Sequence, residues 1–315
     1  MDFNALEYRF DINDPRWKGY LYENSFVVLK GVVSQEQTTD YLNRMWCDIE
    51  ELSGNKVNRN ITATRTRASN YPYMMHGGMI QYMGHSQLQW DIREVCAPVF
   101  ANLYNVSIEN LSTSFDGLCF MDGVRKYQQR SDIDFLHVDQ SPKKQYQYSI
   151  QGLLNLVDSG PADGGFVCVP GSHKYTEFWE GKEIPATSKD WYLFTAADKV
   201  SDPMFEESIK VCCAAGDFVL WDSRAWHCNT VPTSQNIRAC TYVCMLPKKN
   251  VPNKIKIQRK QAIQDGRVSN HHPGTGFHLF PKKPQWCGDE TYAKAVAIQQ
   301  RAVLTPLQKR LADLE

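Results

Sequence analysis

His137 and Asp139 are separated by a single residue, and no other histidine in the chain has a carboxylate two positions later. Eight histidines and 35 acidic residues in 315 are enough to produce such a pair by chance, so its surroundings decide its meaning. In a β-strand, alternate side chains lie on the same face, so both residues would reach one metal ion. Two histidines and one carboxylate bind non-haem Fe(II) and leave coordination positions open. The pair therefore predicts two of the three ligands of an iron site.

The third predicted ligand is His227, which begins a strand after the apolar run 218–221. The next turn contains Pro232 and predicts a tight hairpin in which Asn229 lies opposite Arg238. Arg238 would then share a face with His227, two residues away. Two residues of strand span roughly 7 Å, and the carbon chain of 2-oxoglutarate spans about 5 Å. A 2-oxoglutarate bound to the metal would therefore reach the guanidinium.

Arg238 lies in an apolar run between Ile237 and Ala239. A buried guanidinium is costly unless an anion meets it, and its planar pair of donors suits a carboxylate. That carboxylate belongs either to 2-oxoglutarate or to an internal Asp or Glu, and the arginine by itself favours neither.

The elements that position these residues fall into three parts of one 315-residue domain: a mainly helical part, 1–112, a β-rich part, 113–246, and a helical part, 247–315. In the first part, Ser34 and Gln37 predict a capping box for a helix with apolar residues at helical spacing, followed by Gly54. A strand is expected at 26–33, and a second helix at 87–104, interrupted by Pro98.

The β-rich part consists of short β-prone runs separated by Gly, Pro and Asp, which is typical of a barrel or sandwich. Strands are expected at 114–121, 146–157, 166–169, 209–213, 217–222 and 237–245. In the last part, a basic run from Lys248 to Lys260, including Arg259, is interpreted as the solvated face of a helix rather than a phosphate or nucleic-acid site. Helices are expected at 289–303 and 306–314.

Thirty-five basic and thirty-five acidic residues give no net charge, which argues against general affinity for nucleic acid or anionic membranes. The chain shows no signal peptide, no membrane span and no peroxisomal or retention signal. Ten cysteines without a CxxC pair are expected to be buried reduced thiols. These features favour a soluble cytoplasmic protein, with a small molecule rather than nucleic acid as its partner.

From about 113 to 246 the chain resembles the phytanoyl-CoA dioxygenase family, a branch of the iron and 2-oxoglutarate oxygenases. The matching segments, in the family's order, are Phe135-Leu-His-Val-Asp-Gln140, Gly164-Gly-Phe-Val-Cys-Val-Pro-Gly-Ser-His173, Gly216-Asp-Phe-Val-Leu-Trp221, His227 and Arg238. The resemblance implies a mainly β fold with flanking helices and a double-stranded β-helix core of the jelly-roll or cupin-like type. It also implies that His137, Asp139 and His227 bind Fe(II) and that Arg238 binds 2-oxoglutarate.

Further residues are assigned from their positions relative to these motifs. Gln151 falls where the family has a co-substrate contact, and Asn229 where a small polar contact is usual. Trp221 and Arg224, just before the third ligand, are candidate substrate contacts.

Two segments lie outside the motifs. The segment 71–93 contains His76 and His85, and the segment 175–208 is interpreted either as a lid or as an ordinary surface excursion. None of the remaining histidines is expected to bind iron, including His173 in a turn and His271 and His272 in a loop.

The resemblance implies an Fe(II)- and 2-oxoglutarate-dependent dioxygenase that consumes O2, hydroxylates an unidentified small organic substrate and releases succinate and CO2. Asp139 argues against a halogenase, in which that position is left open for halide. Desaturation and cyclisation begin with the same hydrogen abstraction and stay as alternatives. Two other hypotheses are a catalytically silent β-helix that only binds a ligand, and a cupin-type metal oxygenase that does not use 2-oxoglutarate.

Overall fold

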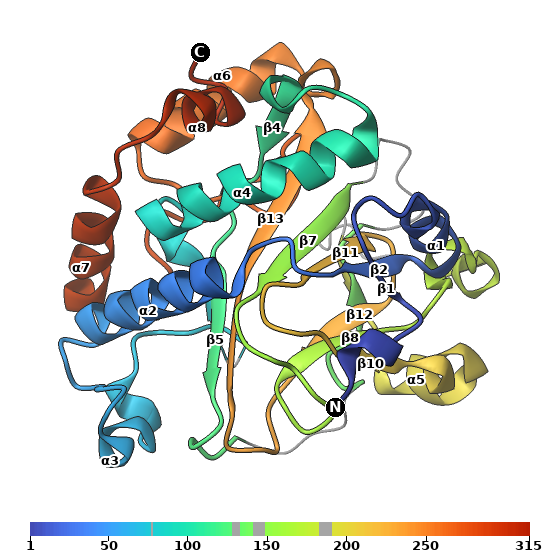
Figure 1. Ribbon diagram of the computed structural model, residues 1–315, viewed down its shortest axis with the longest axis horizontal. Coiled ribbons are helices and arrows are strands. Elements are labelled where there is room, and N and C mark those ends of the chain that lie inside the picture. Colours follow the sequence, from blue (N-terminus) through green and yellow to red (C-terminus); the bar gives the residue numbers. More distant parts are fainter. Residues whose placement is uncertain (77, 128–132, 141–148, 183–190) are drawn as a thin grey trace.

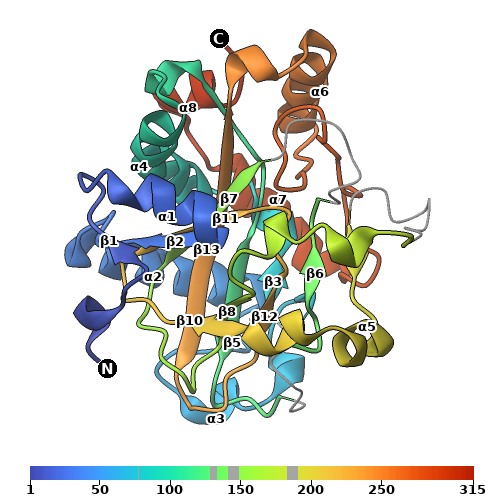
Figure 2. The same ribbon diagram turned by 90° about the vertical axis from the view of Figure 1, so that its right-hand side faces the viewer.

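Two facing β-sheets form the centre of the molecule, and helices surround them (Figure 1). The structure is a computed structural model that describes residues 1–76, 78–127, 133–140, 149–182 and 191–315. The two chain termini lie at opposite ends of the molecule in both views (Figures 1 and 2). Among the described residues, no helix combines the length and apolar character that crossing a membrane requires.

The larger sheet has eight strands, and most of its neighbours pair antiparallel. Its order is β1 (Arg9–Phe10), β2 (Phe26–Leu29), β11 (Phe218–Asp222), β7 (Ile150–Asn155), β13 (Ile237–Pro247), β5 (Leu118–Asp122) and β3 (Met79–Ile80), with β4 (Leu111–Thr113) also paired to β13. The smaller sheet has five strands in the order β10 (Ile209–Val211), β8 (Gly165–Cys168), β12 (His227–Thr230), β6 (His137–Val138) and β9 (Tyr192–Leu193). This pair of sheets confirms the expected jelly-roll core with flanking helices.

Side chains of the larger sheet alternate between two apolar layers, as the period of a strand requires. On β11, Phe218 and Leu220 belong to the layer beneath the helices, whereas Val219 and Trp221 face the smaller sheet. The helices on the outer side include α1 (Arg16–Asn24), α2 (Gln35–Leu52), α4 (Gln87–Tyr104), α7 (Asp289–Gln300) and α8 (Pro306–Leu311). Figure 1 shows α4 crossing the larger sheet, with α2 beside it. Both faces of this sheet are therefore covered.

The outer face of the smaller sheet is covered by the segment that follows β8. Trp179, Phe194 and Phe205 from this segment pack against Val138 and Trp226. The same segment carries α5 (Ala196–Ser201) and the edge strand β9, which pairs with β6. Figure 2 shows α5 on the side of the molecule away from α4 and α8. The segment 175–208 thus forms an apolar cover over the smaller sheet, while its residues 183–190 lie outside the described part.

The expected N-terminal helices are confirmed. Ser34 and Gln37 form both hydrogen bonds of the capping box at the start of α2, and Gly54 follows that helix with φ +68°. The helix α4 runs over the expected residues but continues through Pro98 without a break. Two other helices are α3 (Thr62–Arg65) and α6 (Asn253–Gln264).

Two expectations are wrong, one about the basic run near the C-terminal part and one about a strand. Arg259 does not lie on a solvated helix face: it is fully buried, with its Nε 2.6 Å from Asp313 Oδ2 and its Nη2 2.6 Å from the carbonyl of Thr113. The single strand expected at 114–121 is interrupted, because Ser114 and Phe115 turn to bond Cys244 and Ser269 between β4 and β5. The strand expected at 146–157 is described only from Ile150, since 141–148 lie outside the described residues.

The hairpin expected around Pro232 is also wrong. The strand β12 pairs with β6 and β8 in the smaller sheet, whereas β13 belongs to the larger sheet. The connection between them crosses from one sheet to the other, and the backbone N–H groups of Thr233 and Ser234 both bond the carbonyl of Ala162 instead of a partner strand. Arg238 and Asn229 consequently face each other across the space between the sheets, not along a ladder.

Candidate metal and co-substrate site

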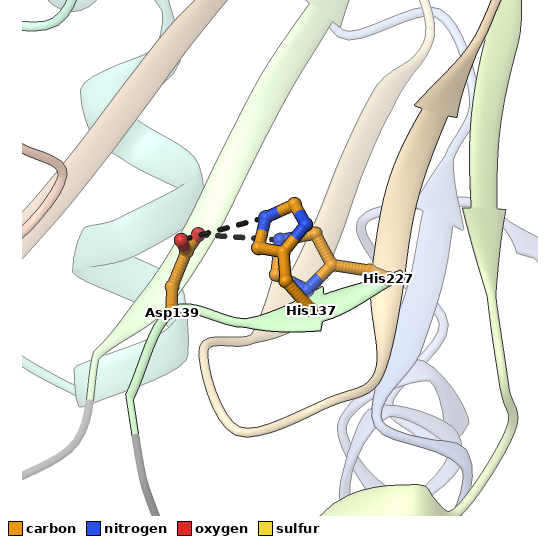
Figure 3. A group of neighbouring side chains, drawn as sticks. All are labelled: His137, Asp139 and His227. Atoms are coloured by element: carbon orange, nitrogen blue, oxygen red, sulfur yellow. Dashed lines mark hydrogen bonds and ion pairs between the residues drawn. The ribbon is translucent and has the colours of Figure 1, made fainter. Parts of the chain in front are cut away.

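The two histidines proposed as ligands lie directly opposite each other on paired strands. His137 on β6 is the register partner of His227 on β12, and their ring centroids are 4.5 Å apart. Asp139, one residue beyond the end of β6, points back towards both imidazoles (Figure 3). Its carboxylate lies 3.5 Å from His137 Nε2 and 3.2 Å from His227 Nε2. The three ligating atoms lie within 4.8 Å of one another, close enough to share one metal ion.

Each imidazole is oriented by a backbone carbonyl two residues earlier, just before its strand begins. Nδ1 of His137 lies 2.8 Å from the carbonyl of Phe135, and Nδ1 of His227 lies 2.8 Å from the carbonyl of Ala225. A carbonyl only accepts, so both Nδ1 atoms carry the proton and both Nε2 lone pairs face Asp139. Metal-ligating histidines are typically held by a hydrogen bond of this kind. The rings are therefore presented in the tautomer that a metal requires.

The protonation states also fit a divalent cation. Burial, and then the neighbouring His227, lower the pKa of His137 to about 4. Burial alone would raise the pKa of Asp139, but the nearby histidines, His271 foremost, hold it well below its usual range. Neutral imidazole and ionised carboxylate are the forms that bind metal. A nitrogen and oxygen donor set of two histidines and one carboxylate suits Fe(II) and leaves room for further ligands.

Gln151, on β7 of the larger sheet, bonds the proposed ligand set. Its Nε2 donates to Asp139 Oδ2 at 2.8 Å, and its side chain also lines the adjoining cavity. In this structure it orients the carboxylate ligand. A direct contact between Gln151 and a co-substrate stays a prediction.

Arg238 points into the space between the two sheets. It is only 3% exposed, and its Nη2 donates to Asn229 Oδ1 at 2.6 Å while its Nη1 donates to the carbonyl of Gly165 at 2.5 Å. The amide of Asn229 in turn donates to the Tyr242 hydroxyl at 3.0 Å. Of the residues that the structure describes, no Asp or Glu forms an ion pair with Arg238, so the internal ion pair left open by the sequence is absent there. Nη2 also lies 3.8 Å from Cys240 Sγ. A buried guanidinium without a carboxylate partner favours the binding of an anion.

A cavity of about 580 Å³ opens beside the His137, Asp139 and His227 cluster. Much of its wall is aromatic, and strands of both sheets, together with several connecting segments, contribute to it. Its lining includes His137, Asp139, His227, Gln151, Asn229, Trp221 and Tyr242. Such a volume is that of a small-molecule site.

The remaining candidates occupy different places. Trp221 lines the cavity, but Arg224 does not: its guanidinium pairs with the carboxylate of Asp222 at 2.9 and 2.8 Å. His76 lines the cavity, whereas His85 is buried away from it, with Nε2 2.8 Å from the carbonyl of Arg267.

Sequence reasoning missed a third wall, formed by the loop between α6 and α7. Asn270, His271, Phe277 and Phe280 from this loop line the cavity, and His271 Nδ1 lies 3.6 Å from Asp139 Oδ2. His271 was expected to be an ordinary loop residue. The paired histidines in a segment rich in Gly and Pro were a signal, but a loop carries no periodicity that would predict its direction.

The comparisons with known proteins agree with this geometry. Residues 21–240 match the model of the family described as phytanoyl-CoA dioxygenase (PhyH). A relative from Aspergillus versicolor, "Ava biosynthesis cluster protein O", is 25% identical over 295 residues, which cover 87% of this chain and 89% of the relative. A putative phytanoyl-CoA dioxygenase from Dictyostelium discoideum is 26% identical over 156 residues, covering 49% of this chain and 43% of that protein.

Among solved structures, the non-heme alpha ketoglutarate dependent carbocyclase SnoK from nogalamycin biosynthesis shares the fold. Its TM-score is 0.51 at 15% identity, with 76% of this chain and 87% of that chain covered. The family match spans well over half of the chain and includes all three proposed metal ligands and Arg238. The chain therefore belongs to the phytanoyl-CoA dioxygenase (PhyH) family.

Proposed function

We propose that the protein is an Fe(II)- and 2-oxoglutarate-dependent dioxygenase that hydroxylates a small organic substrate and releases succinate and CO2. The observation that carries this proposal is the convergence, beside one cavity, of the His137, Asp139 and His227 cluster with the hydrogen-bonded chain that leads from Asn229 to the buried Arg238.

His137, Asp139 and His227 would hold the iron, which supplies the site where O2 and 2-oxoglutarate react. His137 and His227 contribute neutral Nε2 atoms because the carbonyls of Phe135 and Ala225 fix their tautomers. Asp139 contributes the charged ligand, and Gln151 limits its rotation through the hydrogen bond to Oδ2.

Arg238 would bind the far carboxylate of 2-oxoglutarate. Its Nη1 and Nη2 already have oriented acceptors, Gly165 and Asn229, so the guanidinium is held in one plane before a ligand arrives. Bidentate binding of a carboxylate by a preorganised guanidinium is both strong and selective. This arrangement favours 2-oxoglutarate over a cupin-type mechanism that needs no co-substrate.

The proposed outcome is hydroxylation, because the carboxylate ligand Asp139 occupies the position that a halogenase leaves open. The aromatic walls around Phe135, Trp191 and Trp221 would exclude water and hold the target C–H bond near the metal. The similar carbocyclase shows that this fold also hosts ring closure, so product identification is part of the test.

The direct test is to load the purified protein with Fe(II) without oxygen, titrate it with 2-oxoglutarate, and then admit O2. We expect saturable 2-oxoglutarate binding and slow succinate formation, both of which require the intact metal site. Binding of 2-oxoglutarate without succinate formation, whichever substrate is added, would favour a catalytically silent binding protein. Metal-dependent oxygen uptake that is unchanged in Arg238→Ala would favour the cupin-type alternative.

A further inference from the structure

The interruption between β4 and β5 places a carboxylate in the wall of the cavity. Asp116 lies in this break, is only 5% exposed and lines the same cavity as the metal ligands. Its backbone carbonyl faces away from the cavity, where it accepts hydrogen bonds from Gln89 Nε2 at 2.9 Å and Arg93 Nη2 at 2.8 Å. The side chain is thereby left on the cavity side of the strand break.

The carboxylate of Asp116 forms few polar interactions with the described part of the protein. Among the described residues, its one hydrogen bond comes from the hydroxyl of Ser114 to Oδ2, and no Lys, Arg or His lies within ion-pair distance. Burial raises the pKa of Asp116, against smaller opposing effects of His271, Ser114 and Arg93. Arg93 therefore acts on this carboxylate only from a distance, and Oδ1 is available to a ligand.

Among the described residues, the cavity wall contains two carboxylates and five histidines. Among the described residues that line it, the only carboxylates are Asp116 and Asp139, and none is a lysine or arginine. Once iron and 2-oxoglutarate are bound, the doubly charged metal, Asp139, the dianion and Arg238 together carry no net charge. Among the described residues of the cavity wall, Asp116 would then be the one carboxylate that iron and 2-oxoglutarate leave uncompensated.

The other walls are suited to a positive ligand. Phe135, Trp191, Trp221, Phe277 and Phe280 surround the space with aromatic rings. The faces of such rings attract cations, most strongly where water is excluded. A phosphate or carboxylate would lose its hydration here and meet no lysine or arginine among the described side chains of the wall.

We propose that the cavity accepts a cationic substrate, a protonated amine attached to an apolar or aromatic body, whose ammonium group pairs with Asp116. This inference rests on the proposed function, since it assumes that the metal and 2-oxoglutarate neutralise Asp139 and Arg238. It sets the substrate apart from an acyl-CoA thioester, whose phosphates are anionic. Asp116 is accordingly a specificity-determining residue and not a ligand of the metal.

The test uses three probes of similar size that differ in one group: 2-phenylethylamine, 2-phenylethanol and 3-phenylpropanoate. Their affinities are measured by calorimetry in the absence of O2, with the protein loaded with Fe(II) and 2-oxoglutarate. We expect the amine to bind about tenfold or more tightly than the carboxylate, because a close buried charge pair contributes at least this much. The alcohol should fall between them.

The variant Asp116→Asn keeps the size of the side chain and an acceptor for Ser114, so it should fold. It should lose most of the preference for the amine while leaving 2-oxoglutarate affinity unchanged. The matched control is Asp40→Asn, which removes an exposed carboxylate on α2 and should retain the full preference.

Three results would overturn the proposal: a carboxylate that binds as tightly as the amine, an alcohol that equals the amine, or an amine preference that survives in Asp116→Asn. Failure of iron or 2-oxoglutarate to bind at all would instead contradict the proposed function. Normal binding of both without an amine preference would contradict only the assignment of the substrate charge.

Discussion

The two sheets contribute to the site in different ways. The smaller sheet supplies His137 from a two-residue strand and His227 from a four-residue strand, and a backbone carbonyl two residues before each histidine orients its imidazole. The larger sheet supplies Arg238 from the eleven-residue strand β13, and both oxygen acceptors of its guanidinium, on Gly165 and Asn229, belong to the smaller sheet. The orientation of the proposed metal-binding nitrogens is thus set locally, whereas the proposed 2-oxoglutarate site forms only where the two sheets face each other.

Removal of the metal carboxylate should give the largest effect. Asp139→Ala leaves two imidazoles and no charged ligand, so we expect iron affinity to fall by more than about 100-fold, beyond the loss typical of a residue that only supports a ligand. Succinate formation should fall with it. Iron titration followed by a succinate assay checks this, with circular dichroism to show that the fold persists. Full activity in this variant would remove the proposed metal site.

Removal of the Arg238 guanidinium should weaken 2-oxoglutarate binding and leave iron binding unchanged. Arg238→Gln loses the charge and the planar pair of donors, and we expect the KM for 2-oxoglutarate to rise by about 100-fold, equivalent to about 3 kcal/mol for charged hydrogen bonds. Iron affinity should stay within about twofold, because the imidazoles are held by their own strands. Loss of iron binding in Arg238→Gln would show that the metal site and the 2-oxoglutarate site are not independent.

Acidification should lower the free energy of unfolding of the metal-free protein through its buried histidines. The pKa of His137 is lowered to about 4, chiefly by burial, whereas an unfolded histidine has a pKa of about 6.5. The unfolded chain therefore binds more protons in this window, so stability present above pH 6.5 is lost as the pH falls towards 4, by up to about 3 kcal/mol for this residue. Urea unfolding at several pH values measures it.

His85, whose burial also lowers its pKa to about 4, adds a loss of the same sign and serves as a reference. His137→Gln should reduce the pH dependence and leave the contribution of His85. An unchanged slope in His137→Gln would show that His137 is not buried in its neutral form.

Gln151 connects the two sheets and should give a smaller effect. Gln151→Leu removes the hydrogen bond to Asp139, and we expect about tenfold weaker iron binding, as for other residues that orient a ligand. If Gln151 acts only through Asp139, the KM for 2-oxoglutarate measured at saturating iron stays unchanged. A raised KM under these conditions would instead support the direct co-substrate contact that the resemblance implies.

Arg224 should give the smallest effect. Its guanidinium pairs with Asp222 and lies outside the described wall of the cavity. We expect Arg224→Gln to change stability by no more than about 1 kcal/mol and to leave the kinetic constants within about twofold. A large rise in the KM of a substrate would restore Arg224 as a substrate contact.

The sequence predicted the elements better than their arrangement. The capping box of Ser34 and Gln37, the span of α4 and most strands in the β-rich part follow from local signals, because caps and periodicity depend on neighbours within a few residues. The prediction of a hairpin around Pro232 was wrong because this turn bonds Ala162, a residue about 70 positions earlier. The prediction for Arg259 was wrong for the same reason, since its partner Asp313 lies beyond two further helices.

For the site itself, residue types and motif order determined the identity of the candidates: His137 with Asp139, then His227 and Arg238. Only the tertiary structure decided that Arg238 reaches Asn229 across two sheets, that Gln151 bonds the metal carboxylate, and that Asp116 and His271 stand in the same cavity. Spacing along a strand records which side chains share a face. Contacts between sheets and from loops depend on how whole strands and loops pack, even where the two residues are only nine positions apart, as Asn229 and Arg238 are. No local pattern encodes that packing.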